Sequence, residues 1–293
     1  MIESPSIVNE YFGPADCATR DNLDYEMQSR FRSLIGSLMF AAISWRVDIL
    51  MKVVHLARFV SMPNEKIYKA GMRILRYLKK TSNYGIKFSK VPCYTGKIQP
   101  MLMTCTDSNY AADKDGVSTS CYMVQLTDRF VWDKMTTAQP VNLNLVSYAS
   151  KRQREVTQSS TETEYIAGAL SVKNLLHEKY LMEELGFSQP SMPMFFDNTA
   201  VRFMANEWKV TEKSKHINTR YHLLRYHAIK GTVVIYYIDT LENVADIGTK
   251  PLPVSMHGYL IKKIMDGTVS SEVRPTMVIR KRQRRVLYDD RGI

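Results

Sequence analysis

The order in which apolar patterns change along the 293 residues constrains the fold more than any other feature. Three short segments rich in β-forming residues follow one another at 102–106, 120–126 and 143–148, separated by polar loops. Helical and strand patterns then alternate: a helix at 162–185, a strand at 194–196, a helix after 197, a helix at 219–230, a strand at 232–238 and a helix from about 243. Sequential strands followed by this alternation predict a mixed sheet with helices packed on it.

A small helical unit is predicted ahead of the sheet. Apolar residues recur at helical spacing over 31–59, with a break at 44–48 where a second helix is expected to start. A third helix is expected at 64–80. The predicted division of the chain is a loosely ordered lead-in at 1–24, the helical unit at 25–95, an α/β domain at 96–268 and a basic tail at 269–293.

The formal net charge of +11 predicts a polyanionic partner, because Lys and Arg bind nucleic acid by neutralising phosphates. Basic residues recur at steps of three and four in the third helix and therefore share one of its faces: Lys66, Lys69, Arg73, Arg76 and Lys80. An ordinary solvated helix face is the alternative. The tail carries a second basic cluster at 280–285, which fits a nuclear-import signal or a nucleic-acid arm.

The sequence excludes several classes of protein. It has no run of about 18 apolar residues, and its first residues lack the basic-then-apolar pattern of a signal peptide. A cytoplasmic or nuclear protein with no membrane contact and no secretion is therefore expected. The four cysteines have no C-x-x-C spacing, so neither a zinc site nor a disulfide framework is indicated.

Four acidic residues stand at the edges of the predicted elements. Asp107 closes the first strand and Glu164 opens the long helix. Asp197 follows the fourth strand, and Asp246 opens the last helix. Taken singly, each could be a turn residue or could complement a helix dipole. As an ordered set they suggest a Mg²⁺ site, because carboxylates are the protein ligands that Mg²⁺ prefers and such a cluster of like charges is unfavourable without metal.

The region 101–266 resembles the ribonuclease H domain of copia-type LTR-retrotransposon Pol polyproteins. The stretches that carry the resemblance are Thr106-Asp107-Ser108-Asn109-Tyr110-Ala111, Ser159-Ser160-Thr161-Glu162-Thr163-Glu164-Tyr165-Ile166-Ala167, Asp197-Asn198, Lys215-His216-Ile217-Asn218-Thr219-Arg220-Tyr221-His222 and Ala245-Asp246-Ile247-Gly248-Thr249-Lys250-Pro251-Leu252-Pro253. Residues 31–40 and 73–78 similarly resemble the segment that follows the polymerase palm in that family.

The resemblance implies an α/β fold with a ribonuclease H-like mixed five-stranded sheet and flanking helices, preceded by the small helical unit. It implies a metal-dependent endonuclease that hydrolyses the RNA strand of RNA-DNA hybrids, with two Mg²⁺ or Mn²⁺ ions. The family's catalytic metal ligands carry over onto Asp107, Glu164, Asp197 and Asp246. An RNA-DNA hybrid and the reverse transcriptase portion of a parent polyprotein are the implied partners. The alternative is a decayed or domesticated copy that binds nucleic acid without cutting it.

Glu164 is preferred over Glu162 as the fourth ligand because it matches the family's catalytic Glu, although helical periodicity leaves both open. The small residues Ala167 and Gly168, one turn later, would allow the helix to approach the sheet closely.

Several polar residues are candidates for nucleic-acid contacts. Ser108, Asn198 and Thr199 could read 2′-hydroxyls of the RNA strand, or could orient the carboxylates instead. His216 and Arg220 could contact phosphate, with capping or packing as the alternative for the histidine. The loop 239–243 contains no histidine, so a product-release role for such a residue is not supported.

Overall fold

The computed structural model describes residues 3–88, 99–112, 114–128, 144–154, 156–206 and 222–266. Two nucleic-acid candidates, His216 and Arg220, lie outside these residues, as does the predicted basic tail at 269–293.

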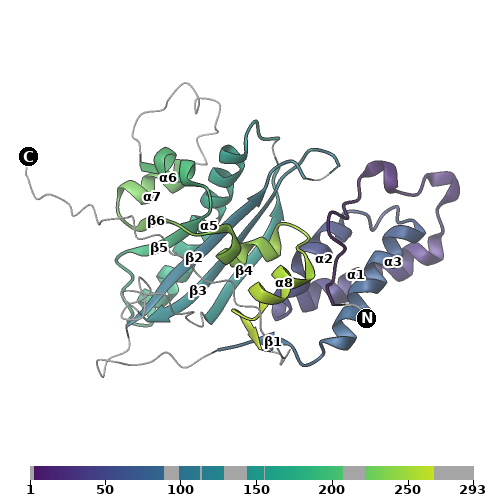
Figure 1. Cartoon of the computed structure of the whole chain (residues 1–293), viewed down its shortest axis with the longest axis horizontal. Coiled ribbons are helices and arrows are strands. Elements are labelled where there is room, and N and C mark those ends of the chain that lie inside the picture. The colour runs from purple at the N-terminus through teal and green to yellow at the C-terminus, as the bar shows by residue number, and fades with distance from the viewer. Residues whose placement is uncertain are drawn as a thin grey trace, which may run out of the picture.

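The core of the structure is a mixed five-stranded sheet in the order β4-β3-β2-β5-β6 (Figure 1). Its strands are β2 (Pro100–Asn109), β3 (Thr119–Asp128), β4 (Asn144–Arg152), β5 (Met192–Phe196) and β6 (Val233–Tyr237). The first three form an antiparallel meander, whereas β5 pairs parallel with both β2 and β6. The ribonuclease H-like mixed five-stranded sheet predicted from the sequence is confirmed. Because β2 and β5 are parallel, their carboxyl ends meet at one edge of the sheet.

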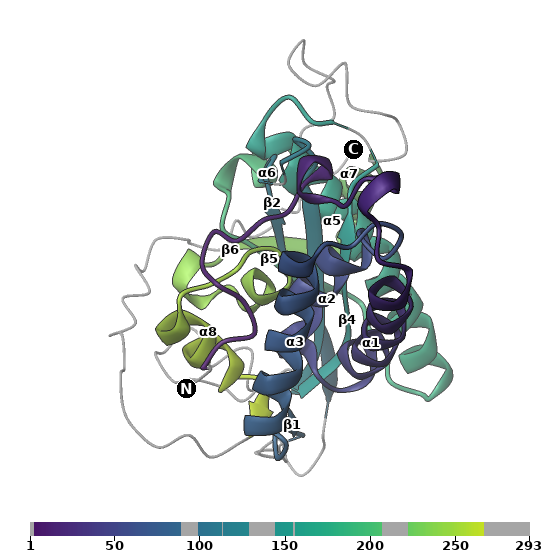
Figure 2. The same cartoon turned by 90° about the vertical axis from the view of Figure 1, so that its right-hand side faces the viewer.

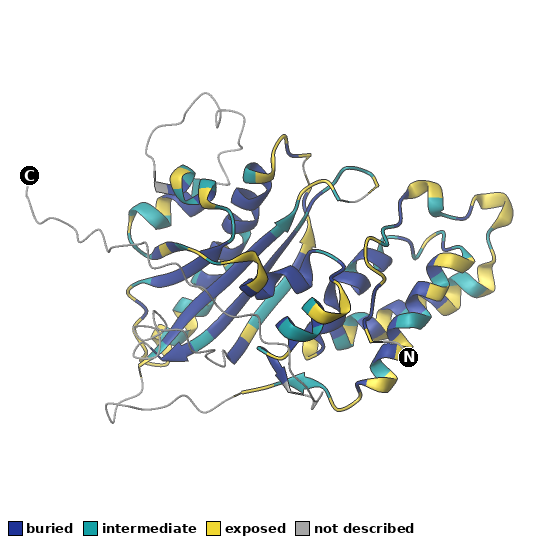
Figure 3. Cartoon of the chain, viewed as in Figure 1, coloured by how far each residue is buried: buried dark blue, intermediate teal, exposed yellow. Residues whose placement is uncertain are grey.

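Helices cover both faces of the sheet (Figure 1). The helices are α1 (Tyr25–Ser44), α2 (Leu50–Ala57), α3 (Glu65–Lys80), α5 (Ser160–Glu184), α6 (Thr199–Asn206), α7 (Leu223–Ile229) and α8 (Val254–Ile261). Short 3-10 turns are η1 (Pro14–Asp16), η2 (Arg20–Asn22), η3 (Val47–Ile49), η6 (Thr240–Glu242) and η7 (Val244–Gly248). The strands between the helical layers are largely buried on both faces, as the dark blue sheet of Figure 3 shows.

On one face, α5 packs directly on the central strands. Its amino end is capped by Ser159, whose side chain accepts a hydrogen bond from the backbone N–H of Glu162. The close approach depends on Gly168, where a Cβ would lie 2.7 Å from Leu224 Cδ2 and 2.9 Å from Phe196 Cζ. The predicted role of small residues at this turn of the helix is therefore confirmed for Gly168.

The other face is covered by the helical unit together with η7 and α8. One continuous core joins Phe31, Ile35 and Ile74 of the helical unit to Met103 and Cys105 of β2. The two-residue strands β1 (Gly85–Ile86) and β7 (Met265–Asp266) also pair, which ties the end of the helical unit to the last described residues. The helical unit thus docks on the sheet, while its boundaries at 25–95 stay a prediction.

The lead-in was predicted to be loosely ordered, and over its described residues 3–24 this is wrong. The segment passes between α8 and the helical unit (Figure 2). Phe12 is fully buried, and its backbone N–H donates to Nε2 of His55 at 2.9 Å. Glu10 accepts from Lys52 Nζ at 2.7 Å. The segment shows no sequence periodicity because single side chains, rather than a regular face, anchor it.

Candidate metal centre

Three of the four predicted acids converge where β2 and β5 end. Asp107 lies on β2, Asp197 directly follows β5, and Asp246 lies in η7. One carboxylate oxygen from each lies within 4.8 Å of the others. Asp107 and Asp246 are buried, whereas Asp197 is half-buried and leaves the cluster open on one side. Such a set of hard oxygen donors is the type that binds Mg²⁺ or Mn²⁺.

The fourth acid lies in the opposite layer and is not one of the three carboxylates whose oxygens lie within 4.8 Å of one another. Glu164 lies in the second turn of α5 and is 5% exposed. Its Oε1 accepts from the backbone N–H and the hydroxyl of Ser108, at 3.0 and 2.8 Å. Its Oε2 is buried without a hydrogen-bond partner. Glu162 instead accepts from the backbone N–H of Gln158 at 2.7 Å. Glu162 therefore makes a capping contact, and the choice of Glu164 as the fourth ligand stays a prediction.

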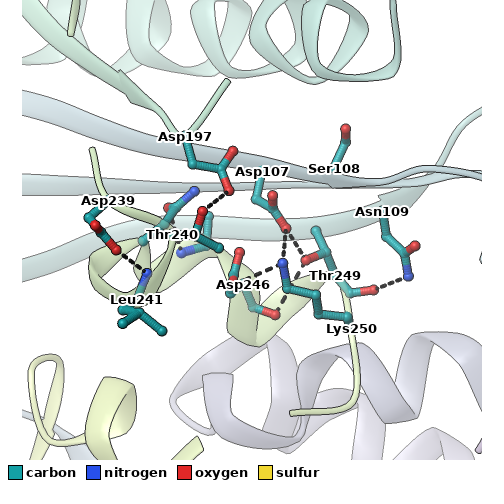
Figure 4. Close-up of polar contacts among 12 residues, drawn as sticks. Asp107, Ser108, Asn109, Asp197, Asp239, Thr240, Leu241, Asp246, Thr249 and Lys250 are labelled. Carbon is teal, nitrogen blue, oxygen red and sulfur yellow. Dashed lines mark hydrogen bonds and ion pairs between the residues drawn. The ribbon is translucent and has the colours of Figure 1, made fainter. Parts of the chain in front are cut away.

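A lysine and a threonine that were not singled out from the sequence complete the cluster (Figure 4). Lys250 Nζ lies 2.9 Å from Asp246 Oδ2 and 3.9 Å from Asp107 Oδ2. The hydroxyl of Thr249 donates to Asp107 Oδ2. The sequence signal for Lys250 is its i,i+4 spacing from Asp246, which places two side chains on one side of a helical turn.

Burial dominates the electrostatics of the site. It raises the pKa of Asp246 to about 8, and the charge of Asp107 adds to this shift. Burial and the charges of Asp107 and Asp197 also raise the pKa of Glu164 well above its usual range. Burial alone would lower the pKa of Lys250, but the carboxylates of Asp107 and Asp246 raise it, so this residue is a permanent cation. The raised carboxyl pKa values show that the site disfavours the full negative charge of its acids unless a cation compensates it.

The turn that carries Asp246 is fixed to the sheet by several polar contacts. Asn243 Nδ2 donates to the carbonyl of Thr106 at 3.0 Å, and the same side chain caps η7. A Cβ at Gly248 would lie 2.3 Å from Cys121 Sγ, so only glycine allows this turn to rest on β3. On the other side, the hydroxyl of Thr240 donates to Asp197 Oδ2 at 3.1 Å. These contacts hold two of the acids in place without using all their oxygens.

Buried carboxylate oxygens that lack a hydrogen-bond donor show whether the site suits a cation. Among the described residues, Asp246 Oδ1 and Glu164 Oε2 are buried and have no hydrogen-bond partner. A buried carboxylate oxygen without a donor is costly unless a cation takes that place. Together with the three convergent carboxylates, they fit a divalent metal.

The nucleic-acid candidates around the site differ in availability. The hydroxyl of Ser108 is engaged with Glu164, which favours an orienting role. Asn198 Oδ1 accepts from the backbone N–H of Ala200 at 2.9 Å, and Thr199 at the start of α6 is exposed. Asn198 and Thr199 directly follow Asp197, which is one of the three convergent carboxylates.

The predicted basic face of α3 divides into two parts. Lys69 and Arg76 are exposed, although Lys69 Nζ also lies 2.7 Å from Glu65. Lys66 extends over the ring of Phe12, with its Nζ 5.7 Å from the centroid, and Arg73 is half-buried with an unpartnered Nε. Lys66, Lys69 and Arg76 are thus all exposed on this face, and Arg73 is the residue that is partly withdrawn from solvent.

Other predictions concern redox state and membranes. Among the described residues, the cysteines Cys17, Cys105 and Cys121 form no disulfide. Among the described residues, no helix has the length and apolar character needed to cross a membrane.

The fold and the site together define a ribonuclease H-like protein. No protein-family model matches the chain. It is 31% identical over 226 residues to the retrovirus-related Pol polyprotein from transposon RE1 of Arabidopsis thaliana, which covers 76% of this chain and 14% of that protein. It is 30% identical over 224 residues to the corresponding polyprotein from transposon TNT 1-94 of Nicotiana tabacum, which covers 76% of this chain and 15% of that protein. The chain belongs to the family of retrovirus-related Pol polyproteins of transposons and spans about one seventh of the length of these relatives.

A third relative has a different name. Over 138 residues the chain is 33% identical to secreted RxLR effector protein 161 of Plasmopara viticola, covering 47% of this chain and 82% of that protein. Among solved structures, the foamy viral protease-reverse transcriptase in complex with RNA/DNA hybrid matches with 13% identity and a TM-score of 0.39, over 87% of this chain and 30% of that one. A TM-score this low does not establish a shared fold, and the fold assignment rests on the strand order and the acids.

Proposed function

We propose that the chain is a ribonuclease H-type endonuclease that hydrolyses the RNA strand of RNA-DNA hybrids and depends on Mg²⁺ or Mn²⁺. The observation that carries the proposal is the convergence of Asp107, Asp197 and Asp246, with carboxylate oxygens within 4.8 Å of one another at the ends of two parallel strands. Glu164 adds a fourth carboxylate from α5. The role in a retrotransposon, within its reverse-transcription apparatus, follows from the family.

These residues would hold two metal ions. Asp107, Asp197 and Asp246 would hold them with the oxygens that converge in the cluster, and Glu164 would add the carboxylate that α5 places beside Ser108. Divalent ions held there would supply an activated water and would stabilise the charge that develops on the leaving oxygen. Neighbouring hydroxyl groups hold the carboxylates in position by hydrogen bonds: Ser108 orients Glu164, Thr249 orients Asp107, and Thr240 orients Asp197.

The surroundings of the site suit a polyanion of the proposed kind. The chain has a net charge of +11, and the exposed side chains of Lys69 and Arg76 can approach phosphates from the helical unit. At the site itself, Asn198 and Thr199 offer side chains that can donate to 2′-hydroxyls in the shallow minor groove of a hybrid. Discrimination of RNA from DNA would then occur beside the reacting phosphate.

The test is cleavage of a hybrid whose two strands carry different labels, with Mg²⁺, with Mn²⁺ and with chelator. We expect cutting of the RNA strand alone, only with metal, and a loss of at least about 10²-fold in the Asp107→Asn and Glu164→Gln variants. Glu162→Gln is the matched control, because this acid lies two residues away and caps α5. It should cut like the unaltered chain.

Other outcomes would count against the proposal. Full activity of Glu164→Gln together with loss in Glu162→Gln would reassign the fourth ligand. Binding of the hybrid without any cutting would instead indicate a domesticated nucleic-acid binder. Cutting that persists in chelator would reject the metal site altogether.

A further inference from the structure

One helical turn brings Lys250 back over the cluster. The backbone N–H groups of Thr249 and Lys250 both donate to the carbonyl of Asp246, at 3.2 and 3.3 Å. The side chain of Lys250 therefore lies above the same residue that its backbone contacts. Its Nζ is 2.9 Å from Asp246 Oδ2 and 3.9 Å from Asp107 Oδ2 (Figure 4).

The position of this ammonium is also the position that a metal needs. Asp107 and Asp246 supply two of the three oxygens of the cluster, and Lys250 contacts both residues. Mg²⁺ binds carboxylate oxygens at 2.0–2.1 Å. A divalent ion on Asp246 and an ammonium 2.9 Å from the same carboxylate would repel each other strongly in this buried setting.

The lysine has the freedom to leave. Its side chain is 34% exposed, whereas those of Asp107 and Asp246 are only 2% and 4% exposed. A long, flexible side chain with a route to solvent can turn away, while the two buried aspartates stay fixed to β2 and η7.

We propose that Lys250 is an internal counter-ion of the carboxylate cluster, which holds Asp107 and Asp246 together in the metal-free protein and gives up these contacts when a divalent cation binds. Lys250 then sets the metal affinity by competition. This inference rests on the proposed metal-dependent function and adds a regulatory element to the same site. It makes Lys250 a positioning residue, because its effect on the reaction passes through the metal ligands.

Binding of Mn²⁺ to the whole chain, measured by titration calorimetry without nucleic acid, tests the inference. The Lys250→Gln variant should bind Mn²⁺ about ten-fold more tightly than the unaltered chain, which corresponds to about 1.4 kcal/mol. In chelator, the same variant should melt at a lower temperature, because the buried carboxylates have lost their cation. The Lys250→Arg variant keeps the charge and should stay within about three-fold of the unaltered affinity.

Lys263→Gln is the matched control. Lys263 pairs with Glu242, outside the cluster, so its removal should leave Mn²⁺ affinity unchanged. A folded Lys250→Gln chain that binds Mn²⁺ equally or less tightly would overturn the inference. If Lys250→Gln does not fold, a ten-fold change in Lys250→Arg would overturn it. If the unaltered chain binds no Mn²⁺ and cuts no hybrid, the proposed function fails. If the unaltered chain does both but the Lys250 variants do not change the affinity as expected, only the competition is rejected.

Discussion

In the helical unit, the buried guanidinium of Arg46 and the buried carboxylate of Asp48 satisfy each other. Two hydrogen bonds of 2.9 and 2.7 Å join them, and Arg46 also donates to the carbonyl and hydroxyl of Thr81. At the ends of β2 and β5, by contrast, Asp107 and Asp246 share one ammonium, and one buried oxygen each of Asp246 and Glu164 has no hydrogen-bond partner. The first site is completed by the protein alone, while the second leaves positions for an external cation. Buried charge indicates a functional site where its partners are missing.

The largest expected effect is a loss of folding stability when the ion pair between Arg46 and Asp48 is broken. Changing Asp48 to Asn leaves the charge of Arg46 buried without its carboxylate, which should lower the free energy of unfolding by about 3–5 kcal/mol. Urea denaturation measures the loss. The double variant Arg46→Met/Asp48→Leu removes both charges and should lose far less. Equal losses in the single and double variants would show that packing, and not the ion pair, matters here.

Metal should stabilise the carboxylate cluster selectively. At a Mn²⁺ concentration about 100 times Kd, a single site adds about 2.7 kcal/mol to the stability of the folded chain. The Asp246→Asn variant should lose most of this gain, because it removes a buried ligand. Thermal melts with Mn²⁺ and with chelator provide the measurement, and Glu162→Gln is the control that should keep the gain. Equal gains in both variants would place the ion elsewhere.

The position of Glu164 can be disturbed through packing. At Gly168 an added methyl would lie 2.7 Å from Leu224 and 2.9 Å from Phe196, so Gly168→Ala should cost about 1–3 kcal/mol and displace α5. Gly258 in α8 has nothing within 4 Å of an added Cβ. Gly258→Ala should therefore be neutral or stabilising by up to about 1 kcal/mol. Urea denaturation compares the two, and equal effects would contradict the close contact of α5 with β5.

Binding of the hybrid should distinguish the two parts of the basic face of α3. The exposed pair Lys69 and Arg76 should contact phosphates, so their joint reversal to Glu should weaken binding and reduce the salt slope of log K by about 2. Reversal of Lys66 alone should have a smaller effect on the slope, because it extends over Phe12. Fluorescence anisotropy at several salt concentrations is the measurement. An unchanged slope in the double variant would reject α3 as a nucleic-acid surface.

The smallest effect concerns pH at the junction of α8 and the helical unit. Burial lowers the pKa of His257, whose Nε2 lies 3.2 Å from the carbonyl of Asp48. The unfolded chain therefore binds a proton at His257 more readily than the folded chain does. Its contribution to stability is present above about pH 6.5 and is lost as the pH falls below this value. The melting temperature should fall as the pH is lowered from 8 to 5, and it should fall less in a folded His257→Gln variant.

The predictions from sequence succeeded where a pattern is local. The five strands, the long helix after Ser159 and the three helices ahead of the sheet each have a periodicity or cap that the chain shows directly. The order of the lead-in could not be predicted in this way, because Phe12 and Glu10 anchor it singly, each to a partner more than 40 residues away. The basic face of α3 has the predicted spacing, and Lys66, Lys69 and Arg76 are exposed on it. Only the tertiary structure shows that Lys66 extends over Phe12 of the lead-in.

The sequence by itself determined which residues can bind metal and in what order they follow one another, because carboxylate chemistry and element boundaries are properties of short stretches. Only the tertiary structure decided how far the acids converge, that Ser108 orients Glu164, and that Glu162 caps a helix instead. It also placed Lys250 on two acids that are 139 residues apart in the chain, Asp107 and Asp246. Distances between such residues depend on how parallel strands and packed helices end in space, which no local pattern encodes.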